Sequence, residues 1–261
     1  PSSREGTLYR NYRSSTNMGS RITSTTTINA RDLDRVAFVP ASGFNGVAYV
    51  DFTATAASGG GTFTGTVEIV VGRDYSSGSR YFSDMAGYSA LQQAAVDFLY
   101  DRGVTRGLSV GQYGPESSIR RGDFARMVYL AFSFTPSGMP QAFVDVPVGA
   151  YYTEAVNALY SRGVVSGVGG GFYAPNSTLT RQDAICIVQR AMRAAGRTAN
   201  DGSLSVLNGY SDSGSVAGYA QGAMAFAVQQ GYLPLNGGWL APTRPLTRVD
   251  MAEILYRVLT S

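Results

Sequence analysis

Three arginines at matching positions are the residues of this chain best suited to chemistry. Arg121, Arg181 and Arg248 each stand two residues before an aspartate, and each follows a short string that contains an aromatic residue and a proline. A guanidinium group at such a position can form two parallel hydrogen bonds with a carboxylate. Because the pattern occurs three times in one chain, it indicates a repeat architecture rather than one unique centre.

The composition excludes several kinds of site. All 21 basic residues are arginines and the chain lacks histidine, which removes lysine nucleophiles, histidine general bases and histidine metal ligands. The single cysteine, Cys186, excludes an internal disulfide and cysteine-cluster metal sites, and we expect it to be a buried thiol. The sequence therefore predicts no metal and no cofactor.

Charge and hydropathy limit the partners. Residues 1–80 hold 8 arginines against 6 acidic residues, and residues 81–261 hold 13 against 12, so neither part is a basic patch for nucleic acid. No run of 18 apolar residues occurs, so no membrane span is predicted. The chain begins at Pro1 without methionine, and we expect a processed chain or a piece of a longer one.

The first 75 residues have the pattern of an antiparallel β module. Strands are predicted over residues 36–39, 47–55 and 62–71, with a glycine-rich hairpin connection over 56–61 and a linker over 76–80. Residues 22–28 have a strand-forming composition but few apolar anchors. The strings GFNG, YVDFTA and GTFTGTVEIVV loosely resemble the last strands of bacterial cadherin-like or Ig-like surface modules. That resemblance implies a sandwich-like module.

From residue 81 the apolar residues recur at helical spacing. Three predicted helices each stop at a glycine, Gly103, Gly163 or Gly231, where a left-handed residue can end a helix. A second helix follows in each unit, over residues 123–132, 183–195 and 250–259. The chain is therefore predicted to repeat a helix, a glycine-rich loop and a helix three times.

The starts of the second helices have capping residues. Thr180 and Thr247 are suitable N-caps, and three aspartates in the first turn could reach back to unpaired backbone N–H groups: Asp123, Asp183 and Asp250. The repeated arginine is not needed for capping. We expect it to lie beside exposed N–H groups, where anions are favoured.

Taken together, the marks F-x-D, G-[VIY], G-x-F-x-P and T-R-x-[DE] resemble the S-layer homology repeat, in three tandem copies over residues 81–138, 139–200 and 207–261. The resemblance implies an all-α, pseudo-threefold domain over 81–261, with one helix per repeat in a central bundle. It also implies grooves between repeats that bind secondary cell-wall polysaccharide. The ligand is typically a pyruvylated amino sugar, whose carboxylate meets the repeated arginine.

The resemblance assigns a set of candidate polysaccharide-binding residues. Tyr151 and Tyr219 stand where the family has a tryptophan, and each of three aspartates follows an aromatic residue by two positions. Each type of residue has two possible roles. The aspartates either cap the first helices or bond the sugar. The tyrosines are either stacking platforms or core residues, and the arginines are either ligands or members of structural ion pairs. The full set is Arg121, Arg181, Arg248, Tyr151, Tyr219, Asp84, Asp145 and Asp212.

The first unit departs from the family pattern. Arg120 replaces the capping threonine, and Leu91 aligns with the aromatic position, where it cannot stack on a sugar. We therefore expect the grooves built from the second and third units to be the better preserved.

These patterns predict a secreted cell-surface protein that attaches non-covalently to cell-wall polysaccharide and has no catalytic activity. The alternative is a structural subunit of a surface lattice or filament, whose partners are other copies or other surface proteins. An enzyme of wall metabolism would need a unique carboxylate, whereas almost every acidic residue here has a counterpart in another repeat or a capping role.

Overall fold

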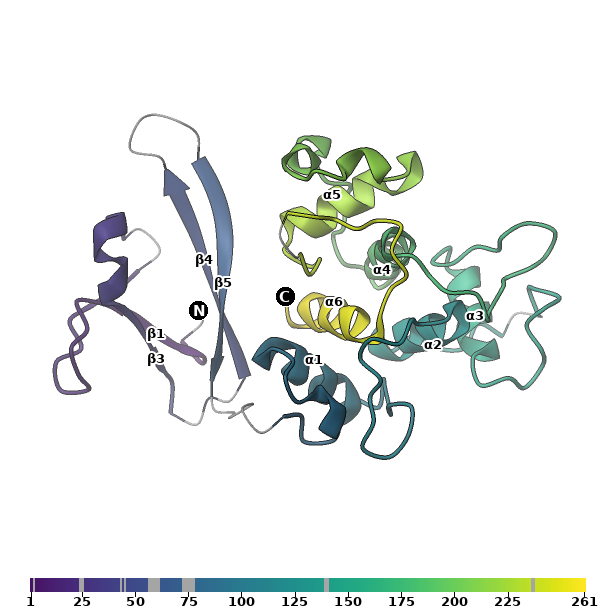
Figure 1. Ribbon diagram of the computed structural model, residues 1–261, viewed down its shortest axis with the longest axis horizontal. Coiled ribbons are helices and arrows are strands. Elements are labelled where there is room, and N and C mark those ends of the chain that lie inside the picture. The colour runs from purple at the N-terminus through teal and green to yellow at the C-terminus, as the bar shows by residue number, and fades with distance from the viewer. Residues whose placement is uncertain are drawn as a thin grey trace. The chain divides into compact units, whose positions relative to one another are not determined.

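The computed structural model describes residues 1, 3–23, 26–42, 44, 46–55, 62–71, 78–138, 141–235 and 238–261. The chain divides into two compact units, Pro1–Asp74 and Tyr75–Ser261 (Figure 1). The predicted connection over 56–61, and residues 76 and 77 of the predicted linker, lie outside the described residues.

The N-terminal unit contains two antiparallel sheets. Strands β1 (Gly6–Arg10), β2 (Ser20–Arg21) and β3 (Val36–Pro40) form the first sheet in the order β2-β1-β3. Strands β4 (Gly46–Thr55) and β5 (Thr62–Val71) pair along their whole length in the second. A 3-10 helix, η1 (Ala30–Arg35), precedes β3. The strands predicted over 36–39, 47–55 and 62–71 are confirmed, and the sandwich-like arrangement stays a prediction.

The stretch with strand-forming composition, residues 22–28, contains no strand among its described residues, and residues 24 and 25 lie outside them. The N–H of Ile22 still donates to the Leu8 carbonyl of β1, at 2.8 Å. The N–H of Thr23 donates instead to the Thr26 hydroxyl at 2.9 Å, a local partner of the kind that competes with a strand ladder. Strand β1 was not predicted, since its five residues contain few apolar anchors.

In the helical unit, helix and loop alternate as predicted. Three helix–loop–helix units follow one another, and we refer to these structural units as repeats one, two and three. Their first helices are α1 (Ala90–Asp101), α3 (Thr153–Ser161) and α5 (Gln221–Gln229), and their second helices are α2 (Arg121–Ala131), α4 (Arg181–Ala194) and α6 (Arg248–Thr260). Short 3-10 helices lie at η3 (Ser83–Met85), η4 (Leu204–Gly209), η5 (Ser213–Ser215) and η6 (Gly218–Ala220).

Glycine ends each of the first helices, as predicted. Gly103, Gly163 and Gly231 have φ values of 69°, 68° and 68°, in the left-handed region. The N–H of Gly163 bonds the Tyr160 carbonyl at 2.9 Å, and the next N–H returns to Leu159. This closure satisfies carbonyls at the end of the helix and turns the chain into the loop.

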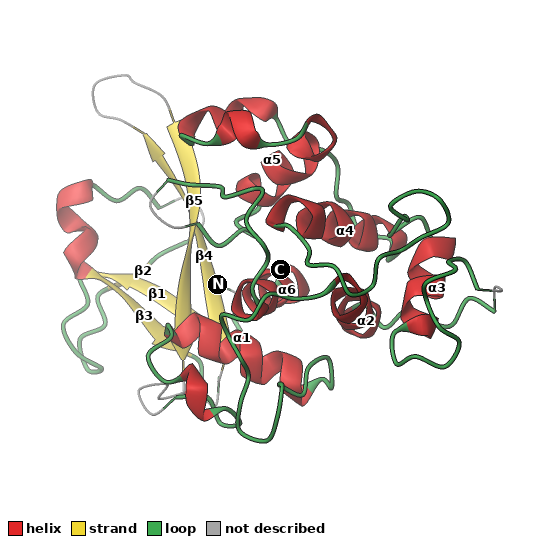
Figure 2. Cartoon of the chain, turned by 45° about the vertical axis from the view of Figure 1, so that its right-hand side comes forward, coloured by secondary structure: helices red, strands yellow, loops and turns green. Residues whose placement is uncertain are grey.

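Each second helix packs against the first helix of the following repeat. Helix α2 packs on α3, α4 packs on α5, and α6 packs on α1 of the first repeat, while α2 also touches α4 and α6 (Figure 2). The pairing therefore runs around the unit and returns to its start.

A ring of backbone hydrogen bonds lies just before the second helices. The N–H of Ile119 donates to the Leu246 carbonyl at 2.9 Å, Leu246 to Leu179 at 2.7 Å, and Leu179 to Ile119 at 3.3 Å. The three side chains are buried. One hydrogen bond between each pair of repeats thus joins all three at the core. These bonds place the start of each second helix against the loop of the next repeat.

Candidate functional site

The three aspartates of the F-x-D strings hold the loops of their own repeats. Asp145 accepts the backbone N–H groups of Tyr173 and Ala174, both at 2.7 Å, one on each carboxylate oxygen. Asp84 and Asp212 make the same pair of bonds at 2.7–2.9 Å, to residues 113–114 and 240–241. Of the two alternatives for these aspartates, the cap of the first helices is not what these bonds form, since each carboxylate holds the loop that leads into the second helix. The bond to a sugar stays a prediction.

Arg181 is buried rather than available at the surface. Its side chain is 2% exposed, Nε donates to the Leu240 carbonyl at 3.2 Å, and Nη2 donates to the Pro234 carbonyl at 2.7 Å. The remaining nitrogen, Nη1, lies 3.2 Å from Asp250 Oδ2. Burial lowers the pKa of this guanidinium, and the neighbouring Asp250 opposes that shift.

The other two repeated arginines make equivalent contacts. Nε of Arg121 donates to the Tyr173 carbonyl at 3.0 Å, and Nε of Arg248 donates to the Tyr113 carbonyl at 2.8 Å. Each guanidinium also lies 4.7 Å from the centre of that tyrosine ring. Each repeated arginine thus reaches into the loop of the next repeat, and the arginine of repeat three reaches back into the loop of repeat one. Of the two alternatives for these arginines, ligand contact and a structural role, the contacts with loop carbonyls support the structural role.

Sequence reasoning missed the role of Tyr113 and Tyr173. Both are fully buried, and each hydroxyl donates back to the carbonyl of the arginine that covers its ring, at 2.9 Å for Arg248 and 3.2 Å for Arg121. Burial raises the pKa of Tyr173 to about 12 and that of Tyr113 further. The available signal was their position in the sequence, since each tyrosine is followed by a glycine or an alanine and then by a proline. In the third repeat the residue at this position is Leu240.

The starts of α4 and α6 are fully capped. The hydroxyls of Thr180 and Thr247 accept the N–H of the third helical residue, Asp183 or Asp250, at 3.3 and 3.2 Å. The N–H groups of the two preceding residues of α4 donate to the Arg244 and Pro242 carbonyls of the next repeat at 3.0 Å, and α2 and α6 make the same contacts. The N–H groups predicted to be exposed for an anion therefore have acceptors within the protein at the starts of α4 and α6.

The aspartates of the first helical turn face the next repeat. Asp183 accepts the Thr180 hydroxyl and the Tyr219 hydroxyl, both at 2.6 Å. Asp123 accepts the Tyr151 hydroxyl. No described backbone N–H donates to these two carboxylates, so the predicted bond to an unpaired backbone N–H is wrong. Asp183 contacts its N-cap through the Thr180 hydroxyl, and both aspartates also connect repeats through a tyrosine.

Tyr151 and Tyr219 are the exposed members of the candidate set. Their exposed fractions are 64% and 63%, although each hydroxyl is bonded to an aspartate of the preceding repeat. Desolvation and that hydrogen bond raise the pKa of each phenol to about 12. An open aromatic face beside a carboxylate at two borders between repeats can cover a sugar ring and accept its hydroxyl groups.

The third border is different. Among the described residues no tyrosine bonds Asp250, whose carboxylate pairs instead with Arg181 and with Arg244; the Arg244 side chain is 44% exposed. Leu91 lies inside α1, whereas Tyr88 precedes α1 by two residues, as Tyr151 and Tyr219 precede α3 and α5. The Tyr88 hydroxyl donates to Glu116 at 2.8 Å. The structure therefore brings a tyrosine and the aspartate of the first helical turn together at two of the three borders.

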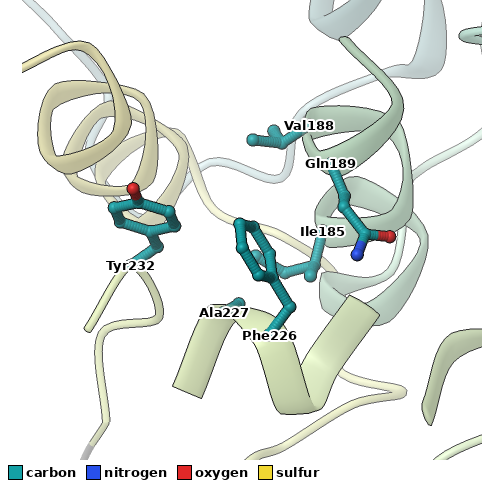
Figure 3. Close-up of a pocket in the computed structure, with 6 residues that line it drawn as sticks. All are labelled: Ile185, Val188, Gln189, Phe226, Ala227 and Tyr232. Atoms are coloured by element: carbon teal, nitrogen blue, oxygen red, sulfur yellow. The ribbon is translucent and has the colours of Figure 1, made fainter. Parts of the chain in front are cut away.

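A small apolar pocket lies elsewhere, between α4 and α5. Figure 3 shows its lining, which includes Ile185, Phe226 and Tyr232 and none of the candidate site residues. Among the described side chains no group of three or more carboxylates or thiols gathers as a metal site. None of the described helices is long and apolar enough to cross a membrane.

Comparison with known proteins relates two segments of the chain to a known domain. Residues 81–125 and 142–185 match the model of the S-layer homology domain. The chain is 31% identical over 182 residues to a surface-layer 125 kDa protein of Lysinibacillus sphaericus, which covers 68% of this chain and 14% of that protein. It is 28% identical over 169 residues to an exoglucanase XynX of Acetivibrio thermocellus, which covers 63% of this chain and 15% of the enzyme. A cell surface protein of Thermoanaerobacter kivui is 28% identical over 171 residues, 64% of this chain and 20% of that protein.

The chain thus spans only about a seventh of the length of the first two relatives, and the match to the enzyme does not extend to most of its length. Two segments of this chain therefore match the S-layer homology domain, an anchoring domain, and the chain is a protein of the bacterial cell wall or cell surface.

Proposed function

We propose that this chain attaches a surface protein non-covalently to the bacterial wall by binding secondary cell-wall polysaccharide, with no catalytic step. The ligand class is an acidic, pyruvylated amino sugar within that polysaccharide. The observation that carries the proposal is the pair of exposed Tyr–Asp contacts at two borders between repeats, Tyr151 with Asp123 and Tyr219 with Asp183.

We also propose that residues 207–261 are a third S-layer homology repeat and that the helical unit is pseudo-threefold. The ring of hydrogen bonds among Ile119, Leu179 and Leu246 supports this proposal, as does the cyclic pairing of the helices. The equivalent placement of the arginines in the loops of successive repeats supports it further.

In the proposed mechanism the tyrosine rings cover sugar faces and the aspartates accept sugar hydroxyls. Arg121, Arg181 and Arg248 position the borders by fixing each helix start against the next loop, and the three F-x-D aspartates hold those loops. This assignment replaces the earlier hypothesis that the repeated arginines meet the sugar carboxylate, since their N–H groups donate to loop carbonyls.

Binding to purified wall sacculi, before and after extraction of the polysaccharide, tests this function. We expect the protein to sediment only with polysaccharide-bearing sacculi, and we expect Tyr151→Ala with Tyr219→Ala to abolish that binding. The control is Tyr100→Ala, which removes a tyrosine that is 37% exposed on α1. Equal sedimentation of the double variant and the wild type would refute the tyrosine contact.

A second candidate function is that of a lattice or filament subunit, since one relative is a surface-layer protein. It predicts that the soluble protein assembles without wall material. Sedimentation velocity in the absence of sacculi separates the two functions.

A further inference from the structure

We propose that the segment entering the helical unit is a force-transmitting clasp, which passes a pull on the N-terminal unit into the closed ring of repeats. The clasp consists of Ser79, Arg80 and Tyr81 together with two carboxylates of α1, Asp97 and Asp101. The inference rests on the proposed function, because a protein held by the wall must resist any pull on its other parts.

Asp97 fixes the entering segment to the buried side of α1. Its side chain is fully buried, and it accepts the Ser79 hydroxyl. It also accepts the backbone N–H and the Nε of Arg80, at 3.2 and 3.3 Å. Because a buried carboxylate that loses its donors is strongly destabilising, these bonds hold the segment firmly against the helix.

Asp101 holds the same segment one helical turn further along α1. It accepts Nη2 of Arg80, and it accepts the Tyr81 hydroxyl at 2.5 Å. The Tyr81 ring stacks on Tyr100, with the ring centres 4.0 Å apart. Arg80 therefore bridges two carboxylates, and charge-assisted bonds of this kind are about twice as strong as neutral ones.

The other two repeats fasten their entering segments with neutral side chains. Asn157 of α3 stands where α1 has Asp97, at the same distance from the glycine that ends the helix. It accepts the Ala142 N–H at 3.2 Å. In repeat three, Gln229 of α5 accepts the Ser203 N–H at 3.3 Å. The carboxylate form of this contact thus belongs to repeat one, which receives the chain from the N-terminal unit.

A pull that reaches the clasp is passed on to the third repeat. Asp84, which follows the clasp in the sequence, holds the backbone N–H of Tyr113, and Arg248 of repeat three donates to the Tyr113 carbonyl. Helix α1 itself packs on α6. While the clasp is closed, a pull on the N-terminal unit therefore acts on repeats one and three together, and their contacts must yield together.

The Asp97→Asn substitution tests the clasp, because it gives α1 the residue that α3 has at this position. The full chain is held by its two ends in an optical trap at constant force, and the lifetime of the folded helical unit is measured. We expect the substitution to shorten this lifetime about tenfold or more, since hydrogen bonds to a charged group are lost where the pull enters.

The matched control is Asp145→Asn, which makes the same chemical change where a carboxylate holds a loop of repeat two. Both variants should lose stability in urea, whereas the lifetime under force should shorten more for Asp97→Asn than its loss in urea accounts for. Lifetimes that follow the urea stabilities alike in both variants would overturn the clasp, because Asp97 would then only stabilise the fold.

Binding to sacculi separates this inference from the proposed function. The Asp97→Asn variant should sediment with polysaccharide-bearing sacculi as the wild type does, since the clasp transmits force and does not contact the polymer. Absence of wild-type sedimentation would overturn the proposed function, whereas the lifetimes under force are measured without wall material and judge the clasp alone.

Discussion

Single residues in this protein act mainly by connecting backbone segments that lie far apart in the sequence. Asp145 binds two loop amides 28 and 29 residues later, and Arg248 reaches the Tyr113 carbonyl 135 residues earlier. Charged side chains that accept or donate two hydrogen bonds to the backbone are strong connectors, and their loss leaves buried polar groups without partners.

Replacing Asp145 tests this role. The Asp145→Ala variant leaves the Tyr173 and Ala174 N–H groups without their acceptor, so we expect unfolding free energy to fall by about 3 kcal/mol. Urea denaturation followed by circular dichroism measures the loss. The control Asp201→Ala removes a carboxylate that is 68% exposed and paired with Arg193, and it should cost less than about 1 kcal/mol. Equal losses would contradict the assigned role.

The buried tyrosines predict an alkaline limit to stability. Burial raises the pKa of Tyr173 from 10.0 to about 12 in the folded protein, so the folded state holds this proton more tightly than the unfolded state. The stabilisation is therefore complete below pH 10 and is lost as pH rises from about 10 to 12. Urea denaturation at pH 9 and pH 11 should show the fall, and Tyr173→Phe should reduce it. A variant with the same pH dependence as wild type would contradict this account.

At the scale of elements, helix boundaries were the most predictable feature. The glycines after α1, α3 and α5 and the threonines before α4 and α6 carry local signals that need no knowledge of the fold. Contacts between repeats were not predictable from spacing. The sequence around Arg181 does not say whether its side chain pairs with a ligand or with the protein. In the structure it donates to backbone carbonyls that lie 53 and 59 residues further along the chain.

The helix-ending glycines give a prediction at this scale. Gly163 has a φ of 68°, and no atom lies within 4 Å of a Cβ built on it. The Gly163→Ala substitution should therefore lower the free energy of unfolding only through the strain of the left-handed backbone, by about 1 kcal/mol. Gly163→Asn should cost less, since asparagine tolerates this conformation. Thermal unfolding of both variants measures the difference. If asparagine destabilised the protein more than alanine, the conformational explanation would be wrong.

At the scale of the whole helical unit, the three repeats complete one another. The third repeat supplies the Leu246 carbonyl for Ile119, the guanidinium that covers Tyr113, and the helix that packs on α1. A chain that ends before this repeat would expose the buried side chains of α1, remove the Arg248 carbonyl that accepts the Tyr113 hydroxyl, and leave the Ile119 N–H without its acceptor. The repeats should therefore fold as one cooperative unit rather than as independent pieces.

Truncation tests that cooperativity. Residues 78–206, which lack the third repeat, should show no cooperative unfolding transition by circular dichroism and should be degraded rapidly by protease, because the ring of inter-repeat contacts cannot close. Residues 78–261 should unfold in one transition, since they contain nearly all of the compact helical unit. A cooperative, protease-resistant 78–206 fragment would show that two repeats suffice. In that case Arg248 and Leu246 would only add to a fold that already exists, and single substitutions at these positions should leave α2, α3 and α4 intact.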